Sequence, residues 1–137
     1  MHRKILFWGI VFAFVSVVLG AFGAHALKSI LSPEKLQSFE TGVRYQIIHA
    51  LALIALFLYS QEFKAHFATQ KSLLWTARFF ILGTILFSGS IYGLAILSVT
   101  YPNWTFLLGP ITPLGGLSFM LGWLNWARLV WMNKVDM

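Results

Sequence analysis

The feature that most constrains the fold is the uncharged run from Ile5 to Ala24, whose 20 residues include one hydroxyl side chain, Ser16. A helix of about 20 apolar residues is long enough to cross the hydrocarbon of a bilayer. A signal peptide is the alternative, because Ala24-His25-Ala26 resembles an A-x-A cleavage site. A transmembrane helix is favoured over that alternative, because the apolar run is longer than is usual for a signal peptide and more apolar runs follow. We therefore expect the first of several transmembrane helices here.

The composition extends this expectation to the whole chain. Of the 137 residues, 58% are hydrophobic and 10% are charged, and the mean hydropathy is +0.77. A soluble domain would carry about 25% charged residues. The apolar runs lack the period-2 alternation of barrel strands. The sequence therefore predicts a single all-α domain, an integral membrane four-helix bundle with spans at about 5–26, 41–60, 79–99 and 113–132.

The second of these spans must carry polar groups into the bilayer. Its strictly apolar part, Ile47 to Tyr59 apart from His49, has 13 residues and is too short to cross. The span must therefore include Arg44, Tyr45 and Gln46 as well as His49. Ionisable groups inside a membrane are candidates for a functional site.

The cations indicate an orientation. Lys and Arg residues are scattered singly and form no basic face, so the net charge of +6 does not indicate nucleic-acid binding. With four spans, seven of them lie on the side of both termini and three, Lys28, Lys35 and Arg44, lie on the other. This asymmetry predicts both termini in the cytoplasm of a bacterium, with the protein in its inner (plasma) membrane.

The same topology brings the polar groups of several helices to one outer level. We expect them to form an outward-facing pocket in which His25 and His49 lie close to each other and to Arg44. The alternative is that they pair off singly to satisfy buried polar groups, with Arg44 paired locally to Glu40. The candidate ligand-binding residues are His25, Arg44, Tyr45, Gln46, His49, Ser90, Tyr92 and Thr112.

Local signals predict where the helices begin and end. Ser32-Pro33 is a typical N-cap and first helical residue, so the second helix should begin well before the membrane. The polar segment 61–77 is expected to be a connection. The uncharged segment 100–111 is expected to fold back into the membrane interface, and Thr112-Pro113 to start the last helix. The residues expected to allow close helix packing are Gly20, Gly89 and Gly93 and, on the last helix, Gly115, Gly116, Ser118 and Gly122.

The side chains needed for most catalytic chemistry are missing from the four spans. The acids, Glu34, Glu40, Glu62 and Asp136, all lie outside the apolar cores, and the chain has no cysteine. His25 and His49 could bind a metal, but a catalytic zinc site needs three protein ligands and no third is evident. A Ser90–His49 pair would lack an acid to orient the histidine. We expect no enzyme activity, no metal and no cofactor.

Four blocks of sequence resemble a known family: GAFGAHAL at 20–27, YQIIHALAL at 45–53, GSIY at 89–92 and LGPITPLGG at 108–116. Together with the later Gly122-Trp123 they are similar to the YgdD-like family of small, uncharacterised bacterial inner-membrane proteins, which has eukaryotic relatives. The resemblance covers nearly the whole chain and implies a four-helix membrane protein. It implies no substrate.

Two functions remain. The first is a non-catalytic membrane protein whose outer polar pocket binds a lipid headgroup, a small ligand or a partner protein; Arg44 with neutral donors suits an anionic headgroup. The second is a small transporter or channel component acting as a homo-oligomer, because four short spans leave little room for a path. A continuous polar path reaching Asn125 would favour the second.

Overall fold

The computed structural model describes residues 2–62 and 67–135, and these residues contain helices and no strand. Each of the four long helices is long and apolar enough to cross a membrane, which confirms the expected all-α fold with four candidate spans. Two short 3-10 helices, η1 and η2, precede α2 and α4. The bounds are α1 His2–His25, η1 Leu27–Ser29, α2 Pro33–Glu62, α3 Phe67–Thr100, η2 Pro102–Leu107 and α4 Ile111–Val135.

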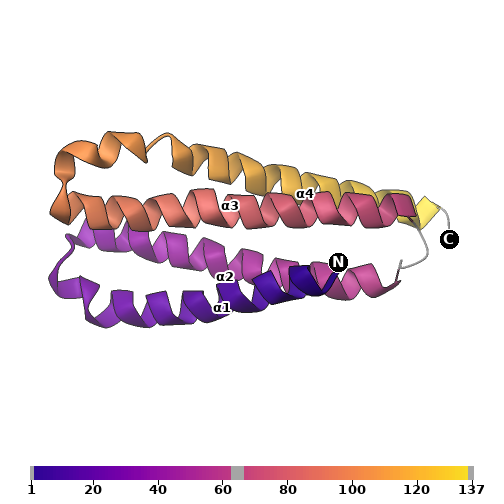
Figure 1. Ribbon diagram of the computed structural model, residues 1–137, viewed down its shortest axis with the longest axis horizontal. Coiled ribbons are helices and arrows are strands. Elements are labelled where there is room, and N and C mark those ends of the chain that lie inside the picture. The colour runs from indigo at the N-terminus through magenta and orange to yellow at the C-terminus, as the bar shows by residue number, and fades with distance from the viewer. Residues whose placement is uncertain (1, 63–66, 136–137) are drawn as a thin grey trace.

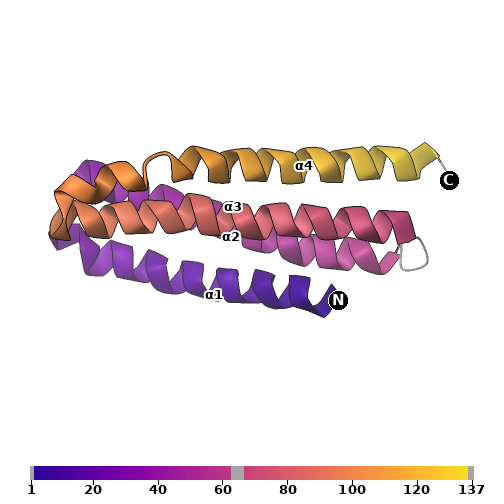
Figure 2. The ribbon, with the colours of Figure 1, turned by 45° about the horizontal axis from the view of Figure 1, so that its top comes forward.

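The helices run antiparallel, and each packs mainly on its neighbours in the chain (Figures 1 and 2). The helices α2 and α3 form the centre, with α1 and α4 on opposite flanks. In the most apolar window of α1 and of α4, 22% is buried, against 39% in α2 and α3. The apolar outer faces of α1 and α4 are thus left for lipid, which is the solvent that such faces need.

The start of α2 agrees with the sequence signal. Its first residue is Pro33, and the backbone N–H of Lys35 donates a hydrogen bond to the hydroxyl of Ser32 at 3.4 Å. The carbonyl of Ser32 accepts the first helical bond, from Leu36, at 2.9 Å. Because this cap forms, α2 begins eight residues before the expected span.

The expectation of a connection at 61–77 is wrong, because α3 already begins at Phe67. Two polar residues of this stretch, Ser72 and Thr76, are bonded to Asn125 of α4. The Asn125 amide nitrogen donates to the Ser72 carbonyl at 2.9 Å and to the Thr76 hydroxyl at 2.8 Å. The Ser72 hydroxyl donates to the Asn125 side-chain oxygen at 3.1 Å. A polar stretch can therefore continue the helix, because its neighbour supplies the partners.

The segment between α3 and α4 lies at the same end as η1 (Figure 1). It contains η2, and the Phe106 side chain within it is 71% exposed. Its insertion into the membrane interface stays a prediction. The helix α4 begins at Ile111, and the hydroxyl of Thr112 lies 2.7 Å from that of Ser90 instead of capping the helix.

The glycines that let helices approach closely are only partly those expected. Gly89 is exposed, and a Cβ built on it would meet no atom within 4 Å. At Gly20 the added Cβ would make an ordinary contact with Val43, at 3.6 Å, whereas at Gly93 it would lie 2.6 Å from the tip of the flexible Leu108 side chain. The four-residue spacing of Gly89 and Gly93 therefore does not identify the packed face of this helix.

The expectation for the last helix is confirmed at Gly115, where an added Cβ would meet the Phe87 backbone of α3, and at Gly122, where it would lie 2.6 Å from the Phe80 ring. Gly9 of α1 also faces backbone, because an added Cβ would lie 3.1 Å from the Ala50 carbonyl oxygen of α2.

Candidate functional site

The most unusual polar group in the membrane-spanning part is His49, which is buried on α2 between aromatic rings. Its ring stacks on Phe119 of α4, with centroids 3.4 Å apart and planes at 8°. Its Nε2 accepts a hydrogen bond from Trp123 Nε1 at 3.1 Å, and its Nδ1 lies 2.7 Å from the carbonyl oxygen of Tyr45. An indole N–H can only donate and a carbonyl can only accept. These partners therefore require the neutral imidazole with its proton on Nδ1.

This bonding leaves His49 with neither ring nitrogen free. A general base needs an open nitrogen facing its substrate, and a metal ligand needs a lone pair that no donor occupies. Within residues 2–62 and 67–135, no three metal-ligating side chains gather in one place. His49 is therefore arranged as a packing residue and not as a reactive group.

A hollow of about 500 Å³ lies beside His49, between α2 and α4. Its lining is mainly aromatic and apolar, which suits a hydrocarbon chain or a flat apolar molecule. Phe87 of α3 contributes to it together with residues of α2 and α4. The lining residues are Tyr45, His49, Phe87, Pro113, Gly116, Phe119, Met120 and Trp123.

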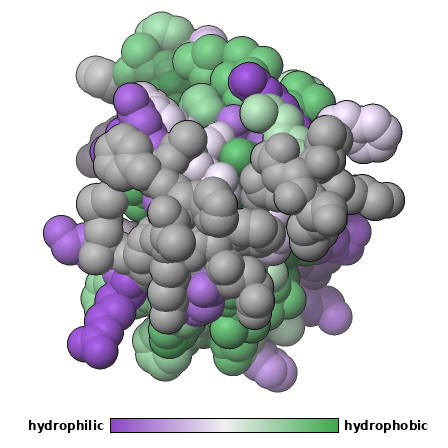
Figure 3. Space-filling model, turned by 90° about the vertical axis from the view of Figure 1, so that its right-hand side faces the viewer, coloured by the Kyte–Doolittle hydropathy of each residue, from purple (hydrophilic) through white to green (hydrophobic). Residues whose placement is uncertain are grey.

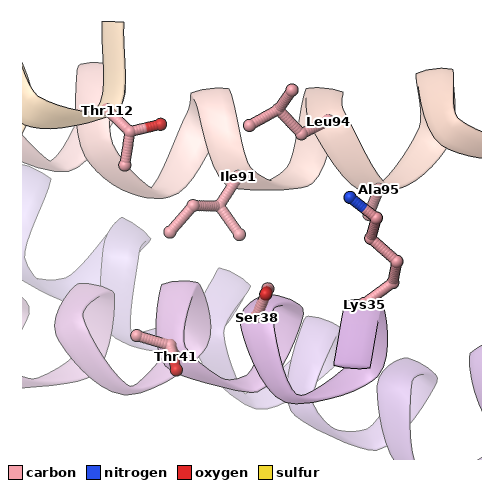
Figure 4. Close-up of a pocket in the computed structure, with 7 residues that line it drawn as sticks. All are labelled: Lys35, Ser38, Thr41, Ile91, Leu94, Ala95 and Thr112. Atoms are coloured by element: carbon pink, nitrogen blue, oxygen red, sulfur yellow. The ribbon is translucent and has the colours of Figure 1, made fainter. Parts of the chain in front are cut away.

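A second hollow, of about 280 Å³, lies nearer the end of the bundle that carries η1 and η2 (Figure 4). Its walls include one charged side chain, Lys35, which extends from α2 toward α3 with its amino group beside Ala95. Hydroxyl side chains from α2 and α4 lie around the same space. The lining residues are Lys35, Ser38, Thr41, Ile91, Leu94, Ala95 and Thr112.

The two hollows lie in line on one face of the molecule. On α2 their lining positions are 35, 38, 41, 45 and 49, spaced by three or four residues as on one helix face. On α3 and α4 the lining continues from 91 to 87 and from 112 to 113. We name this combined feature the α2–α4 groove. From Lys35 to His49 it extends about 21 Å at 1.5 Å per residue.

Three of the eight candidate residues line this groove: Tyr45, His49 and Thr112. Ser90 lies behind it, bonded to Thr112. A ligand-binding role for these residues stays a prediction.

Gln46 and Tyr92 form a separate structural link outside the groove. The Tyr92 hydroxyl donates to the Gln46 side-chain oxygen at 2.9 Å, and the Gln46 amide donates to the Phe12 carbonyl at 3.0 Å. Gln46 is 3% exposed. This pair joins α1, α2 and α3, so it matches the alternative in which polar groups pair off singly.

The expected proximity of His25 to His49 is wrong. A Cβ on Gly23 of α1 would lie 2.9 Å from the Phe39 ring of α2, so in an antiparallel pair His25 is level with about Gln37. His49 is 12 residues further along α2, about 18 Å away along the axis. His25 is exposed at the end of α1. The antiparallel register, which no local signal specifies, separates the two histidines.

Arg44 does not line the groove either. It is exposed, and it lies nine residues from Lys35, which at 100° per residue is the opposite side of α2. The expectation that Arg44 shares a pocket with His49 is therefore wrong. The cation on the face of the groove is Lys35.

Comparison with known proteins supplies the family. A family model described as a protein of unknown function, DUF423, matches residues 19–116. The chain belongs to the DUF423 family. No solved structure matches it.

Relatives of this DUF423 member are membrane proteins by name. The UPF0382 inner membrane protein YgdD of Escherichia coli is 36% identical over 121 residues, which is 88% of this chain and 84% of that protein. A UPF0382 membrane protein of Schizosaccharomyces pombe is 39% identical over 110 residues, 80% of this chain and 86% of its own. One from Haemophilus influenzae is 35% identical over 127 residues, 93% of each. This DUF423 chain is a multi-pass membrane protein of a family without an assigned activity.

Sequence reasoning missed three residues that shape the groove of this DUF423 member: Lys35, Phe119 and Trp123. Lys35 was treated only as an orientation charge, although its spacing of three, six, ten and fourteen residues to 38, 41, 45 and 49 was a usable signal. Trp123 stands out in the sequence only as part of the Gly122-Trp123 block of the family resemblance. No signal along the chain indicates that Phe119 stacks on His49, because that contact joins residues 70 positions apart.

Proposed function

We propose that this protein is a non-catalytic membrane protein whose α2–α4 groove binds an amphipathic molecule with a phosphate-bearing headgroup. The observation that carries the proposal is the polarity of the groove: a cation and hydroxyls line one end, and aromatic rings line the other. The headgroup lies at Lys35 and Thr112, and the hydrocarbon chain lies against Tyr45 and Phe119. Charge-assisted hydrogen bonds hold the phosphate, and apolar contact holds the chain.

The buried polar groups favour binding over transport. In the part of the chain that the structure describes, they form separate groups: Gln46 with Tyr92, Ser90 with Thr112, and Asn125 with Ser72 and Thr76. Phe80, Leu53 and Leu56, which are fully buried, form the core between the two ends. A transported polar solute needs a polar or wet path. These groups give no continuous path to Asn125, so the alternative of a transporter is less well supported.

Lys35→Gln tests the headgroup end of the groove. Wild type and variant are each equilibrated with phosphatidylglycerol and phosphatidylcholine in equal amounts. Native mass spectrometry should show that the variant retains one bound phosphatidylglycerol about fivefold less than the wild type, because one cation near an anionic headgroup contributes about 1 kcal/mol. Arg44→Gln is the matched control: it removes the same charge from the same helix on the opposite face. Equal losses in both variants would contradict the groove.

Gly116→Leu tests the chain end. A Cβ at Gly116 would lie 3.9 Å from the Phe87 ring, an ordinary contact, so the larger side chain can enter the hollow. The same lipid should then be displaced while Lys35 is intact. Unchanged retention in this variant would show that no chain occupies the space beside His49.

We also propose that the protein lies in a bacterial inner membrane with both termini in the cytoplasm. The seven-to-three split of Lys and Arg supports this orientation, and both termini lie at one end of the bundle (Figure 1). A reporter that is active only in the cytoplasm should work when fused to the C-terminus. Activity of a periplasm-only reporter at that position would contradict the orientation and would place the Lys35 end of the groove in the inner leaflet.

A further inference from the structure

A third hollow lies at the end of the bundle that carries the termini. It is formed by a different pair of helices from the α2–α4 groove. It measures about 290 Å³ and lies between α1 and α3. Lys4 of α1 and Arg78 of α3 line it, and both are exposed. Ile5, Trp8 and Ile81 give it an apolar wall. Two cations from different helices thus share one hollow with hydrocarbon-like side chains.

The position of Arg78 is set by an aromatic neighbour. Its guanidinium carbon lies 4.8 Å from the centroid of the Trp75 ring, within the range of a cation–π contact. Trp8, 38% exposed, lies on the α1 side of the hollow. Tryptophan is typical of the membrane–water interface. The hollow therefore lies where lipid headgroups meet hydrocarbon.

The charged side chains that the structure describes at this end of the bundle are all positive. Glu34 and Glu40 are the acids whose side chains the structure describes, and both lie at the opposite end, near the start of α2. Figure 3 looks onto the end with the termini, where hydrophilic side chains lie at several points of the edge between hydrophobic ones. The described cations there are Arg3, Lys4, Lys71, Arg78 and Arg128.

We propose that Lys4 and Arg78 bind the headgroup of an anionic phospholipid whose acyl chain lies along the apolar wall of this hollow. Basic pockets between membrane helices bind such headgroups because the cations neutralise the phosphate near a low-dielectric surface. The wall of Ile5, Trp8 and Ile81 selects a lipid over a soluble phosphate, which would gain nothing from it. This site is independent of the α2–α4 groove, since it lies at the other end of the bundle and binds through α1 and α3.

The experiment compares two double variants that each remove two positive charges from the same end. Lys4→Gln/Arg78→Gln removes the pair at the hollow, and Lys71→Gln/Arg128→Gln removes two cations that do not line it. Each purified protein is equilibrated with bilayers of equal phosphatidylglycerol and phosphatidylcholine, and native mass spectrometry counts the retained lipids. Circular dichroism checks that each variant is helical.

The wild type should retain phosphatidylglycerol over phosphatidylcholine, and the Lys4/Arg78 double variant should lose one such lipid with about a thirtyfold fall in retention, since two cations contribute about 1 kcal/mol each. The Lys71/Arg128 control should keep it, and Lys4→Arg/Arg78→Lys should restore it. Equal losses in the two double variants, or no preference in the wild type, would overturn the proposal. Displacement of the lipid by an equal concentration of glycerol phosphate would also overturn it, because the wall would then contribute nothing. The lipid that Lys35→Gln is expected to lose is bound at a different site, the α2–α4 groove. The experiments can therefore contradict one proposed site without contradicting the other.

Discussion

Gly115→Ala should lower the free energy of unfolding by about 3 kcal/mol, the upper part of the range for overpacking a tight interior. A Cβ at this position would lie 2.7 Å from both Cα and Cβ of Phe87 on α3 and would also contact the Phe87 backbone nitrogen. Backbone atoms cannot move aside as a flexible side chain can, so α4 would have to shift away from α3. The melting temperature in detergent, followed by circular dichroism, measures the effect.

Two glycines of the same chain provide controls. At Gly116 an added Cβ would be in ordinary contact with the Phe87 ring, and at Gly89 it would meet no atom within 4 Å. Alanine at either position should leave the melting temperature nearly unchanged, or raise it slightly because alanine favours helix. If Gly115→Ala and Gly116→Ala have the same melting temperature, α3 and α4 do not approach each other as closely as the structure has them.

His49→Ala should lower the free energy of unfolding by about 2 to 3 kcal/mol, because it removes a ring from a packed interior and leaves a donor unpaired in hydrocarbon. The substitution removes the ring that stacks on Phe119 and leaves the Trp123 N–H without its acceptor. In hydrocarbon no water replaces that acceptor. Thermal unfolding in the same detergent measures the loss.

His25→Ala is the matched control, since His25 is exposed at the end of α1 and the same atoms are removed. Its free energy of unfolding should lie within about 0.5 kcal/mol of the wild-type value, as is usual for surface substitutions. His49→Gln, whose amide oxygen can accept from Trp123, should recover part of the loss. Equal melting of the two alanine variants would show that His49 does not hold α2 to α4.

The sequence by itself determined those features that depend on residues close together in the chain. The length and uniformity of the run from Ile5 to Ala24 required a membrane helix, because hydrocarbon leaves the backbone no partner outside a helix. The cap at Ser32-Pro33 determined the start of α2, because capping involves residues within one turn. The shortness of the second apolar run required polar groups in the bilayer at Tyr45, Gln46 and His49.

The partners of those polar groups were decided only by the tertiary structure. Helical spacing says that Lys35 and Arg44 lie on opposite faces of α2, but not which face meets the groove. Which residues of α1 lie level with His49, and whether Gly89 or Gly115 meets another helix, depend on the register and rotation of antiparallel neighbours. Those are set by side chains far apart in the chain, such as Phe119 on His49 and Asn125 on Ser72. Several registers satisfy the same local pattern, and packing selects one of them.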